Sequence, residues 1–460
     1  MLVALLLLLS LSRAIEAGGE ESDARLCDSK VALDPRPHSV SITEFGAVGD
    51  GKTLNTIAFQ NAIFYLKSFV DKGGAQLYVP PGRWLTGSFN LTNHLTLFLE
   101  KGAVVVGSQD PTHWGVVEPL PSYGRGIELP GGRYRSLING YMLDDVVITG
   151  DNGTIDGQGS AWWGWFTDKS LNYSRPHLVE LVSSKSIVVS NLTFLNAPAY
   201  SVHPVYCSDV HIQNISVYAP PESPFTVGIA PDSSHNVCIE DCTVRTGYDS
   251  ITLKSGWDEY GISYHVPTSN LHIRRVHLES STGSTIAFGS EMSGGISHVH
   301  IEEAQIYHSF TGVDFRTTRG RGGFITDISI TDLDMEDVNR AFRATGQWGT
   351  HADDNFDPLA LPVVSRISIC DVAGRHIAQA GEFSGIMESP FTDLCLSNIT
   401  LSLDSEPSDS WTCSDVSGYS YLVSPEPCTQ LQTGKPCVNS SSLGSIHDQG
   451  HINTGEAAAM

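Results

Sequence analysis

Two patterns in this 460-residue sequence are of kinds that bind phosphate or metal ions. Residues Gly46 to Thr53 read Gly-Ala-Val-Gly-Asp-Gly-Lys-Thr, which satisfies the P-loop pattern for nucleotide phosphates. No later hydrophobic run ends in an obvious magnesium-binding acid, so we expect a Gly-rich turn before a helix over 56–66. Cys238 and Cys242 have no second nearby pair with zinc-type spacing, and we expect no metal or other cofactor.

A short pattern repeated from about residue 140 onward indicates the elements that must position any site. Two apolar residues flank a variable one, and a turn rich in Asn, Asp or Gly follows. Copies lie at Val146–Ile148, Ile187–Val189, Val210–Ile212, Val237–Ile239, Leu271–Ile273, Val299–Ile301, Ile328–Ile330, Ile367–Ile369 and Leu394–Leu396. Most successive copies start 23 to 39 residues apart, which is too short a period for independent domains. Since each unit must bury its apolar face on the next, we expect a parallel β-solenoid; a β-propeller would repeat more steadily, every ~40–45 residues.

The middle residue of each copy should point outward. This column contains His211, Cys238, His272 and His300, which could hold a metal, but we expect a ladder of side chains on a solvent face. An open solenoid end exposes strand edges, so we assign the helix over 56–66 to an N-terminal cap. The chain after about residue 406 is rich in Ser, Gly and Pro with three cysteines, and suits a cross-linked C-terminal cap.

The N-terminus and the sequons favour export. The apolar stretch Leu2–Leu11 is followed by small residues, which predicts a signal peptide over 1–17. Seven Asn-x-Ser/Thr sequons start at Asn90, Asn152, Asn172, Asn191, Asn214, Asn398 and Asn439. Nine cysteines in an exported chain predict disulfides with at least one thiol unpaired. We therefore expect a secreted glycoprotein with one β-helix domain over 39–430 and a flexible tail over 431–460.

Charge and hydropathy exclude several classes of protein. The chain has 27 Lys and Arg against 51 Asp and Glu, a net charge of −24, which argues against nucleic acid as a partner. Hydrophobic residues make up 40 %, and no apolar run after the N-terminus is long enough to span a bilayer, so we expect no membrane association after signal cleavage.

Several ordered segments together resemble the plant polygalacturonases of glycoside hydrolase family 28. They are Phe45–Thr53, Gly153–Gly159 with Trp162 and Trp163, Pro231–Ser234, Lys254–Gly256 and Gly320–Gly323. The resemblance implies an all-β, single-stranded, right-handed parallel β-helix that hydrolyses α-1,4 bonds of pectic polysaccharide with inversion. Such a reaction needs one protonated carboxyl and one ionised carboxylate on opposite faces of the sugar.

The sequence departs from this family where its functional side chains are expected. Phe225-Thr-Val227 stands for Asn-Thr-Asp, Tyr248-Asp249 for Asp-Asp, Gly283-Ser-Thr285 for Gly-His-Gly, and Asp314-Phe-Arg316 for Arg-Ile-Lys. The resemblance thus implies that Asp249 alone is retained, with Arg316 a same-charge replacement and Tyr248 at the position of the general acid. A Lys-to-Arg exchange keeps the charge but changes the hydrogen-bonding fork.

Three interpretations remain open. The chain is a glycosidase whose catalytic acids include Asp249 with Asp314 or Asp232, with Glu291 as a further acid near the substrate. It is an inactive solenoid that binds a wall polysaccharide, or a glycosidase for another glycan. Each acid also has a structural explanation: Asp232 and Asp249 as turn residues, and Asp314 in a surface ion pair.

A polyanion such as pectate would need a local cationic patch on so acidic a protein. Lys254, Arg316, Arg319 and Arg321 could provide it, and Trp162, Trp163, Trp165 and Phe166 could stack on sugar rings or pack against the coil edge. We expect a monomer.

Overall fold

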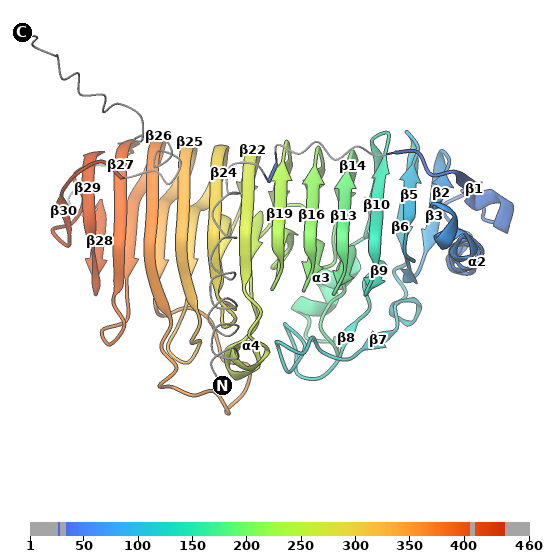
Figure 1. Ribbon diagram of the computed structural model, residues 1–460, viewed down its shortest axis with the longest axis horizontal. Coiled ribbons are helices and arrows are strands. Elements are labelled where there is room, and N and C mark those ends of the chain that lie inside the picture. Colours follow the sequence, from blue (N-terminus) through green and yellow to red (C-terminus); the bar gives the residue numbers. More distant parts are fainter. Residues whose placement is uncertain (1–25, 28–33, 405–409, 438–460) are drawn as a thin grey trace, which may run out of the picture.

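The computed structural model describes residues 26–27, 34–404 and 410–437, and within them the chain winds as a right-handed parallel β-helix with three faces (Figure 1). The predicted signal peptide over 1–17 lies outside the described residues. Each strand of the inner coils pairs in parallel with the strand one coil earlier and one coil later, and strands of the end coils, such as β1 and β30, pair on one side.

Face 1, nearest the viewer in Figure 1, begins with β1 (His38–Ser41), β2 (Ala75–Val79), β5 (Leu95–Leu99), β10 (Asp144–Gly150), β13 (Lys185–Ser190), β16 (Ser208–Gln213) and β19 (His235–Glu240). Face 2 begins with β3 (Gly82–Thr86), β6 (Ala103–Gly107), β11 (Gly153–Asp156), β14 (Leu192–Leu195), β17 (Ser216–Tyr218) and β20 (Thr243–Thr246). Face 3 contains β4 (Phe89–Asn90), β9 (Ile138–Tyr141), β12 (Val179–Val182), β15 (Tyr200–Val205), β18 (Val227–Ile229), β21 (Ile251–Leu253), β23 (Ser284–Phe288) and β28 (Trp411–Ser414).

Long strands bend from one face to the next in the C-terminal half. They are β22 (Thr268–Ser280), β24 (Ile296–Arg316), β25 (Phe324–Thr345), β26 (Val363–Ser384) and β27 (Phe391–Leu403). The last coil on face 1 is β29 (Val416–Ser424) with β30 (Leu431–Thr433).

The remaining elements are short. They are η1 (Ile42–Phe45), α2 (Thr56–Leu66), η2 (Lys67–Lys72), η3 (Pro111–His113), α3 (Ser160–Thr167), α4 (Asp258–Tyr264) and the antiparallel pair β7 (Val116–Val117) and β8 (Arg133–Tyr134). Figure 1 shows α3, β7, β8 and α4 along one edge of the solenoid. No helix among the described residues is long and apolar enough to cross a bilayer.

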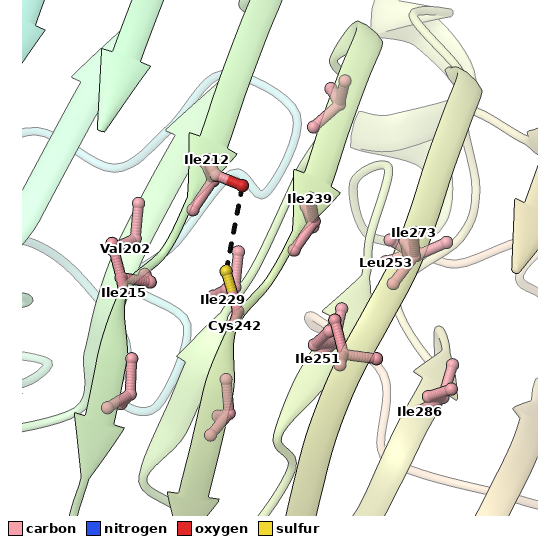
Figure 2. Close-up of a cluster of buried hydrophobic side chains, with 14 of the residues drawn as sticks. Val202, Ile212, Ile215, Ile229, Ile239, Cys242, Ile251, Leu253, Ile273 and Ile286 are labelled. Carbon is pink, nitrogen blue, oxygen red and sulfur yellow. Dashed lines mark hydrogen bonds between the residues drawn. The ribbon is translucent and has the colours of Figure 1, made fainter. Parts of the chain in front are cut away.

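The repeated pattern forms the core as predicted. The flanking residues of every copy are at most 4 % exposed, and they stack on the equivalent residues of neighbouring coils (Figure 2). The turn from face 1 to face 2 is made by one residue in the left-handed conformation, at Asn152, Asn191, Asn214, Asp241 and Asn398 among others. Asn and Asp tolerate this conformation better than other non-glycine residues, which explains why the repeat carries them there.

The expected solvent-facing histidine column is wrong for three of its four members. His211, Cys238 and His272 stack in register with His300, but each is at most 6 % exposed. Cys27 forms a disulfide with Cys238 and lies against the backbone carbonyl of His272, and His211 pairs with Glu240. Cys27 lies 211 residues away from Cys238 in the chain, so no local pattern could indicate this contact.

A helix covers the N-terminal end of the solenoid, and two disulfides link the coils at its C-terminal end. Helix α2 has the bounds that the sequence predicts and buries Phe59, Ala62 and Leu66 at the first coils. The P-loop-like segment is a turn in which the Asp50 carboxylate accepts backbone N–H groups of Lys52 and Thr53. At the other end, disulfides Cys413–Cys428 and Cys395–Cys437 link the last coils, and the thiols of Cys207, Cys242 and Cys370 are free and buried. Strand β30 pairs with β29, so the sheet continues past residue 430.

Candidate active site

Face 3 brings together Asp249, Asp314 and Arg316 from coils that are distant in sequence. Asp249 lies two residues before β21, and Asp314 and Arg316 lie in the last three residues of β24. The Arg316 guanidinium donates from Nη1 to Asp249 Oδ2 at 2.8 Å and from Nη2 to Asp249 Oδ1 at 2.9 Å, and from Nε to Asp314. One cation therefore joins both carboxylates.

Two further side chains complete this cluster, which we call the Asp314 network (Asp249, Ser284, Asp314, Arg316, Arg343). Arg343, one coil beyond Asp314, donates to both of its oxygens. Ser284 Oγ donates to Asp314 at 2.8 Å and accepts from Arg316 at 2.7 Å, while its backbone N–H donates to Asp249 at 2.9 Å. Arg316 therefore contacts three members of the network, and its Nη1 also lies 3.5 Å from the Tyr248 hydroxyl.

This geometry corrects the expected roles of Asp314. The side chain is fully buried, so the surface ion pair is excluded. Burial favours the neutral acid, but Arg316 and Arg343 outweigh it and lower the pKa of Asp314 below its usual range. Asp314 is thus ionised at neutral pH, and no division of acid and base roles with Asp249 arises from a raised pKa of Asp314.

Apolar and aromatic groups occupy the positions next to Asp249. Val227 is 3 % exposed and packs in a small cluster with Ala199, Tyr200 and Ala230, against which Tyr248 also lies. Burial and the Asp249 charge raise the pKa of Tyr248 to about 12. Tyr248 is therefore a poor proton donor near neutral pH.

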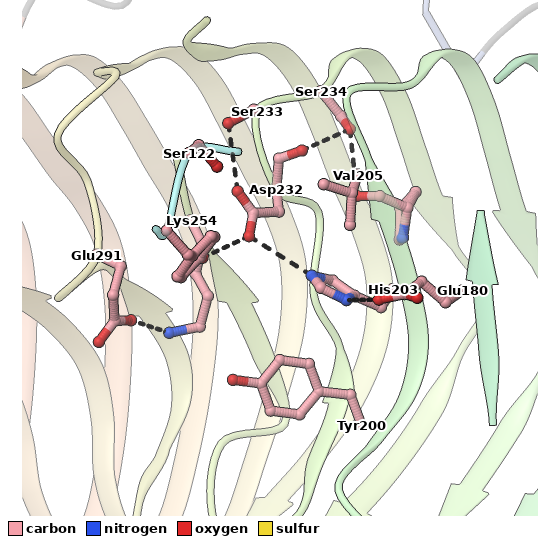
Figure 3. Close-up of polar contacts among 12 residues, drawn as sticks. Ser122, Glu180, Tyr200, His203, Val205, Asp232, Ser233, Ser234, Lys254 and Glu291 are labelled. Carbon is pink, nitrogen blue, oxygen red and sulfur yellow. Dashed lines mark hydrogen bonds and ion pairs between the residues drawn. The ribbon is translucent and has the colours of Figure 1, made fainter. Parts of the chain in front are cut away.

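Asp232 belongs to a separate cluster, the His203 network (Tyr123, Arg133, Glu180, His203, Asp232; Figure 3 labels its last three members). His203 Nδ1 lies 3.3 Å from Glu180 Oε1, and its Nε2 lies 3.5 Å from Asp232 Oδ2. Tyr123 donates its hydroxyl to Asp232 at 2.5 Å, and Arg133 donates to both oxygens of Glu180. Asp232 is fully buried among these groups, away from solvent.

The two carboxylates make the His203 imidazole basic. Burial disfavours its cation, but the ion pairs with Asp232 and Glu180 outweigh burial and raise the pKa of His203. Burial likewise opposes the charge on Glu180, yet Arg133 and the histidines lower its pKa far below the usual range. The network is a buried chain of alternating charges that ends at the Tyr123 hydroxyl.

Lys254 and Glu291 form a third pair, visible beside Asp232 in Figure 3. Burial would raise the pKa of Glu291, but Lys254 and then Arg321 lower it to about 2. The Lys254 side chain is 9 % exposed and that of Glu291 is 16 % exposed. Both groups are charged and satisfy one another.

The expected cationic patch is therefore wrong. Arg316 is 2 % exposed between two carboxylates, Arg321 is fully buried against Asp258, and Lys254 pairs with Glu291. The Arg319 side chain is more exposed than the other three, and it forms an ion pair with Glu388. The four cations do not form a free positive surface, because the chain supplies each with a carboxylate.

Three loops cover much of face 3. Tyr123, in the segment between η3 and β8, reaches Asp232, and Arg125 donates to the carbonyl oxygen of Ala352 at 2.9 Å. Trp257, before α4, donates to the carbonyl oxygen of Thr350 at 3.0 Å. The cavity beside Tyr200 has a volume of about 10 Å³, room for about one water molecule. This cavity is too small for a sugar ring.

The expected sugar-stacking aromatics divide in two. Trp162 is fully buried, with its ring centroid 5.3 Å from that of Trp114 and 5.0 Å from that of Tyr134. Trp163 donates its indole N–H to the carbonyl oxygen of Ala197. The Trp165 ring centroid lies 5.2 Å from that of Trp162, and the Phe166 ring centroid lies 5.9 Å from that of Phe225, which precedes the face 3 strand β18.

Three groups of described side chains have the composition of a metal site, and in one of them Cys27 and Cys238 are joined as a disulfide beside Glu240. The other two are His177 with Glu180 and His203, and His272 with His300 and Glu302. Proton positions argue against both. His177 Nδ1 accepts the Tyr200 backbone N–H at 3.1 Å, so its Nε2 carries the proton and faces Glu180. His272 Nδ1 is buried without a hydrogen-bond partner among the described residues, so metal on Nε2 would leave an unsatisfied N–H there.

Sequence reasoning missed Glu180, His203, Arg343 and Tyr123. Glu180 and His203 are 23 residues apart, and Asp314 and Arg343 are 29 apart, one coil in each case. The length of one repeat could therefore have predicted that the two residues of each pair lie side by side on neighbouring coils. Tyr123 lies in a loop without a periodic pattern, and nothing in the sequence indicated its contact with Asp232.

Comparisons with known proteins agree with this fold. The profile of Glycosyl hydrolases family 28 matches residues 130–425. A "Probable polygalacturonase" of Vitis vinifera is 49 % identical over 438 residues, covering 95 % of this chain and 88 % of the relative. Polygalacturonase-2 of Solanum lycopersicum is 23 % identical over 82 % of this chain and 78 % of its own.

Solved structures match the β-helix over nearly its whole length. A hyperthermoactive exopolygalacturonase from Thermotoga maritima superposes with a TM-score of 0.73 at 24 % identity, over 86 % of this chain and 94 % of its own. A polygalacturonase from Erwinia carotovora has a TM-score of 0.65 at 20 % identity, over 84 % and 98 %. At such identities the likeness establishes the fold alone. The matched family profile and the Vitis relative establish more: this chain is a member of glycosyl hydrolase family 28.

Proposed function

We propose that the chain is a polygalacturonase-like glycosidase that hydrolyses α-1,4-galacturonosyl bonds of pectic polysaccharide in the cell wall. The observation that carries the proposal is the position of Asp249. Its carboxylate lies in the turn two residues before the face 3 strand β21, in a family member whose 49 % identical relative is named a probable polygalacturonase. Lys254, Glu291, Arg316 and Tyr248 would flank the polysaccharide.

In the proposed mechanism, Asp249 activates water and the leaving oxygen is protonated from the other side of the sugar. We propose that the family's usual functional groups are replaced at Val227, Tyr248, Ser284 and Asp314. Tyr248 is then the donor beside Asp249, and its high pKa makes proton donation slow. Hydrolysis should be weak, because a good general acid contributes about 10²–10⁴-fold to the rate.

Binding without hydrolysis is the second candidate, and one observation favours it. Asp249, Asp314, Asp232 and Glu291 are all paired with groups of the chain, and the first three are at most 2 % exposed. A carboxylate that stays in such contacts positions the strands but does not transfer a proton to substrate.

We also propose that the protein is secreted as a glycosylated monomer. Three disulfides support an oxidising compartment. Asn90, Asn152, Asn172, Asn214 and Asn398 are exposed, as glycosylation requires, and Asn191 is half-buried. The sequon at Asn439 lies outside the described residues.

The test compares the protein with Asp249→Asn on pectic oligomers of defined length, with reducing ends counted and the anomer of the product followed. Hydrolysis above the variant, with an inverted anomer, supports the enzyme. Retention on a pectin column with no hydrolysis above the variant supports the binding protein. Neither hydrolysis nor retention would overturn both candidates.

A further inference from the structure

Four aromatic side chains lie one after another beside face 3: Phe166, Phe225 and Tyr248 make successive ring contacts, and Arg316 lies against the rings of both Tyr248 and Trp348. We call Phe166, Phe225, Tyr248 and Trp348 the aromatic line. Ring centroids of Phe166 and Phe225 are 5.9 Å apart, and those of Phe225 and Tyr248 are 5.0 Å apart. Phe225 is 51 % exposed and the other three are half-buried, so the line presents ring surface to solvent.

Guanidinium groups hold this line in place. Arg175 lies 4.2 Å from the Phe166 ring centroid, and Arg316 lies 5.4 Å from that of Tyr248. Trp348, in the loop after β25, has Arg343 at 4.2 Å and Arg316 at 5.1 Å from its ring. Because these cations also pair with carboxylates, the rings rest on a fixed, electrically balanced layer.

The same layer leaves little for a uronate carboxylate to bind. Arg175 pairs with Glu128, Arg343 and Arg316 with Asp314, and Lys254 with Glu291. A ligand carboxylate would have to displace a buried internal partner, which costs more than the new pair returns. The net charge of −24 further repels a polyanion at long range.

We propose that the aromatic line stacks on the rings of uncharged pectic residues, namely galacturonosyl units whose carboxyl groups are esterified. This rests on the proposed function for the pectic class of ligand. The apolar C–H faces of a sugar ring match exposed aromatic surface, and they need no cation. The occupant is therefore an esterified stretch of pectin lying across face 3, with Phe225 its most exposed contact.

The experiment measures binding of the full chain to highly methyl-esterified pectin and to de-esterified pectate of matched length, at low and high salt. We expect tighter binding of the esterified polymer and little change with salt. Phe225→Ala should weaken binding of the esterified polymer about 3- to 10-fold, because one aromatic contact contributes roughly that much to an affinity. Phe64→Ala is the matched control, because Phe64 is 80 % exposed on α2, which lies at the N-terminal end of the solenoid and away from α3 and β25 in Figure 1, and it should bind as the unmodified protein does.

Three outcomes would overturn the proposal: tighter binding of pectate with a steep loss in salt, equal binding of both polymers, or unchanged binding by Phe225→Ala. The proposed function fails separately. If neither pectic polymer is bound or cleaved, the assignment to pectic substrates is wrong. In that case binding of a neutral glucan or mannan that Phe225→Ala weakens would keep the stacking role of the aromatic line, and no such binding would overturn it.

Discussion

The Asp314 network and the His203 network are both buried on face 3, but they are built from different groups. The Asp314 network joins guanidinium groups and carboxylates on adjacent coils. The His203 network contains an imidazole. Two of its members come from outside the solenoid strands: Tyr123 lies in the loop between β7 and β8, and Arg133 lies in β8. The first fastens strands to one another, while the second fastens a loop to the strands. Breaking each should therefore have different consequences.

Arg316→Ala should have the largest effect on stability, because it leaves Asp249 and Asp314 buried with one partner fewer. We expect a loss of about 3–5 kcal/mol in the free energy of unfolding, measured by denaturant titration. Arg319→Ala removes an exposed ion pair with Glu388 and should cost at most about 1 kcal/mol. Equal losses in the two variants would contradict the structural role of Arg316.

The two networks should respond to pH in opposite directions. The pKa of His203 is raised, so its contribution is full below its unfolded value of 6.5 and is lost as pH rises through the folded pKa. The pKa of Asp314 is lowered, so its contribution is present above 3.8 and is lost as pH falls through the folded pKa.

The measurement is unfolding free energy against pH for His203→Gln and Asp314→Asn. We expect His203→Gln to lower the unfolding free energy by about 2–3 kcal/mol near pH 6 and by less at alkaline pH. Asp314→Asn should be less stable than the unmodified protein at neutral pH, and the difference should disappear only in acid. His308→Gln, at an exposed pair with Asp337, should change little at any pH. A deficit of His203→Gln that grows with rising pH would contradict the ion pairs assigned to that imidazole.

Tyr123→Phe should have the smallest effect, and a local one. The change removes one donor from the buried Asp232 carboxylate and should cost about 1–2 kcal/mol. Because Tyr123 fastens a loop, amides in residues 118–133 should exchange hydrogen roughly 10-fold faster, while those of β24 and β25 stay protected. Tyr421→Phe, on an exposed ring of β29, is the control. Uniformly faster exchange would mean that the loop is not a separate unit.

The sequence predicted the solenoid because its repeat is local: inward Val, Ile and Leu recur on every coil, and residues such as Asn191 and Asn214 tolerate the turn conformation. The family resemblance also paired Asp249 with Asp314 as candidate catalytic acids. The sequence could not show that Arg316 and Arg343 both form ion pairs with Asp314, because these contacts depend on the direction in which side chains of neighbouring coils point. Nor could it show the Cys27 disulfide or the Tyr123 contact, which come from segments without a period.

The most direct test of the account is the turnover of pectin by Tyr248→Asp. A carboxyl beside Asp249 would share its site with a like charge, which raises one of the two pKa values and supplies the missing proton donor. We predict a gain in kcat of about 10-fold or more, with KM raised by loss of the Tyr248 ring and a bell-shaped pH profile that Asp249→Asn abolishes. A folded Tyr248→Asp protein with unchanged Tm and no gain in kcat would contradict the claim that face 3 is a pectin-cleaving site whose general acid, Tyr248, is a poor one.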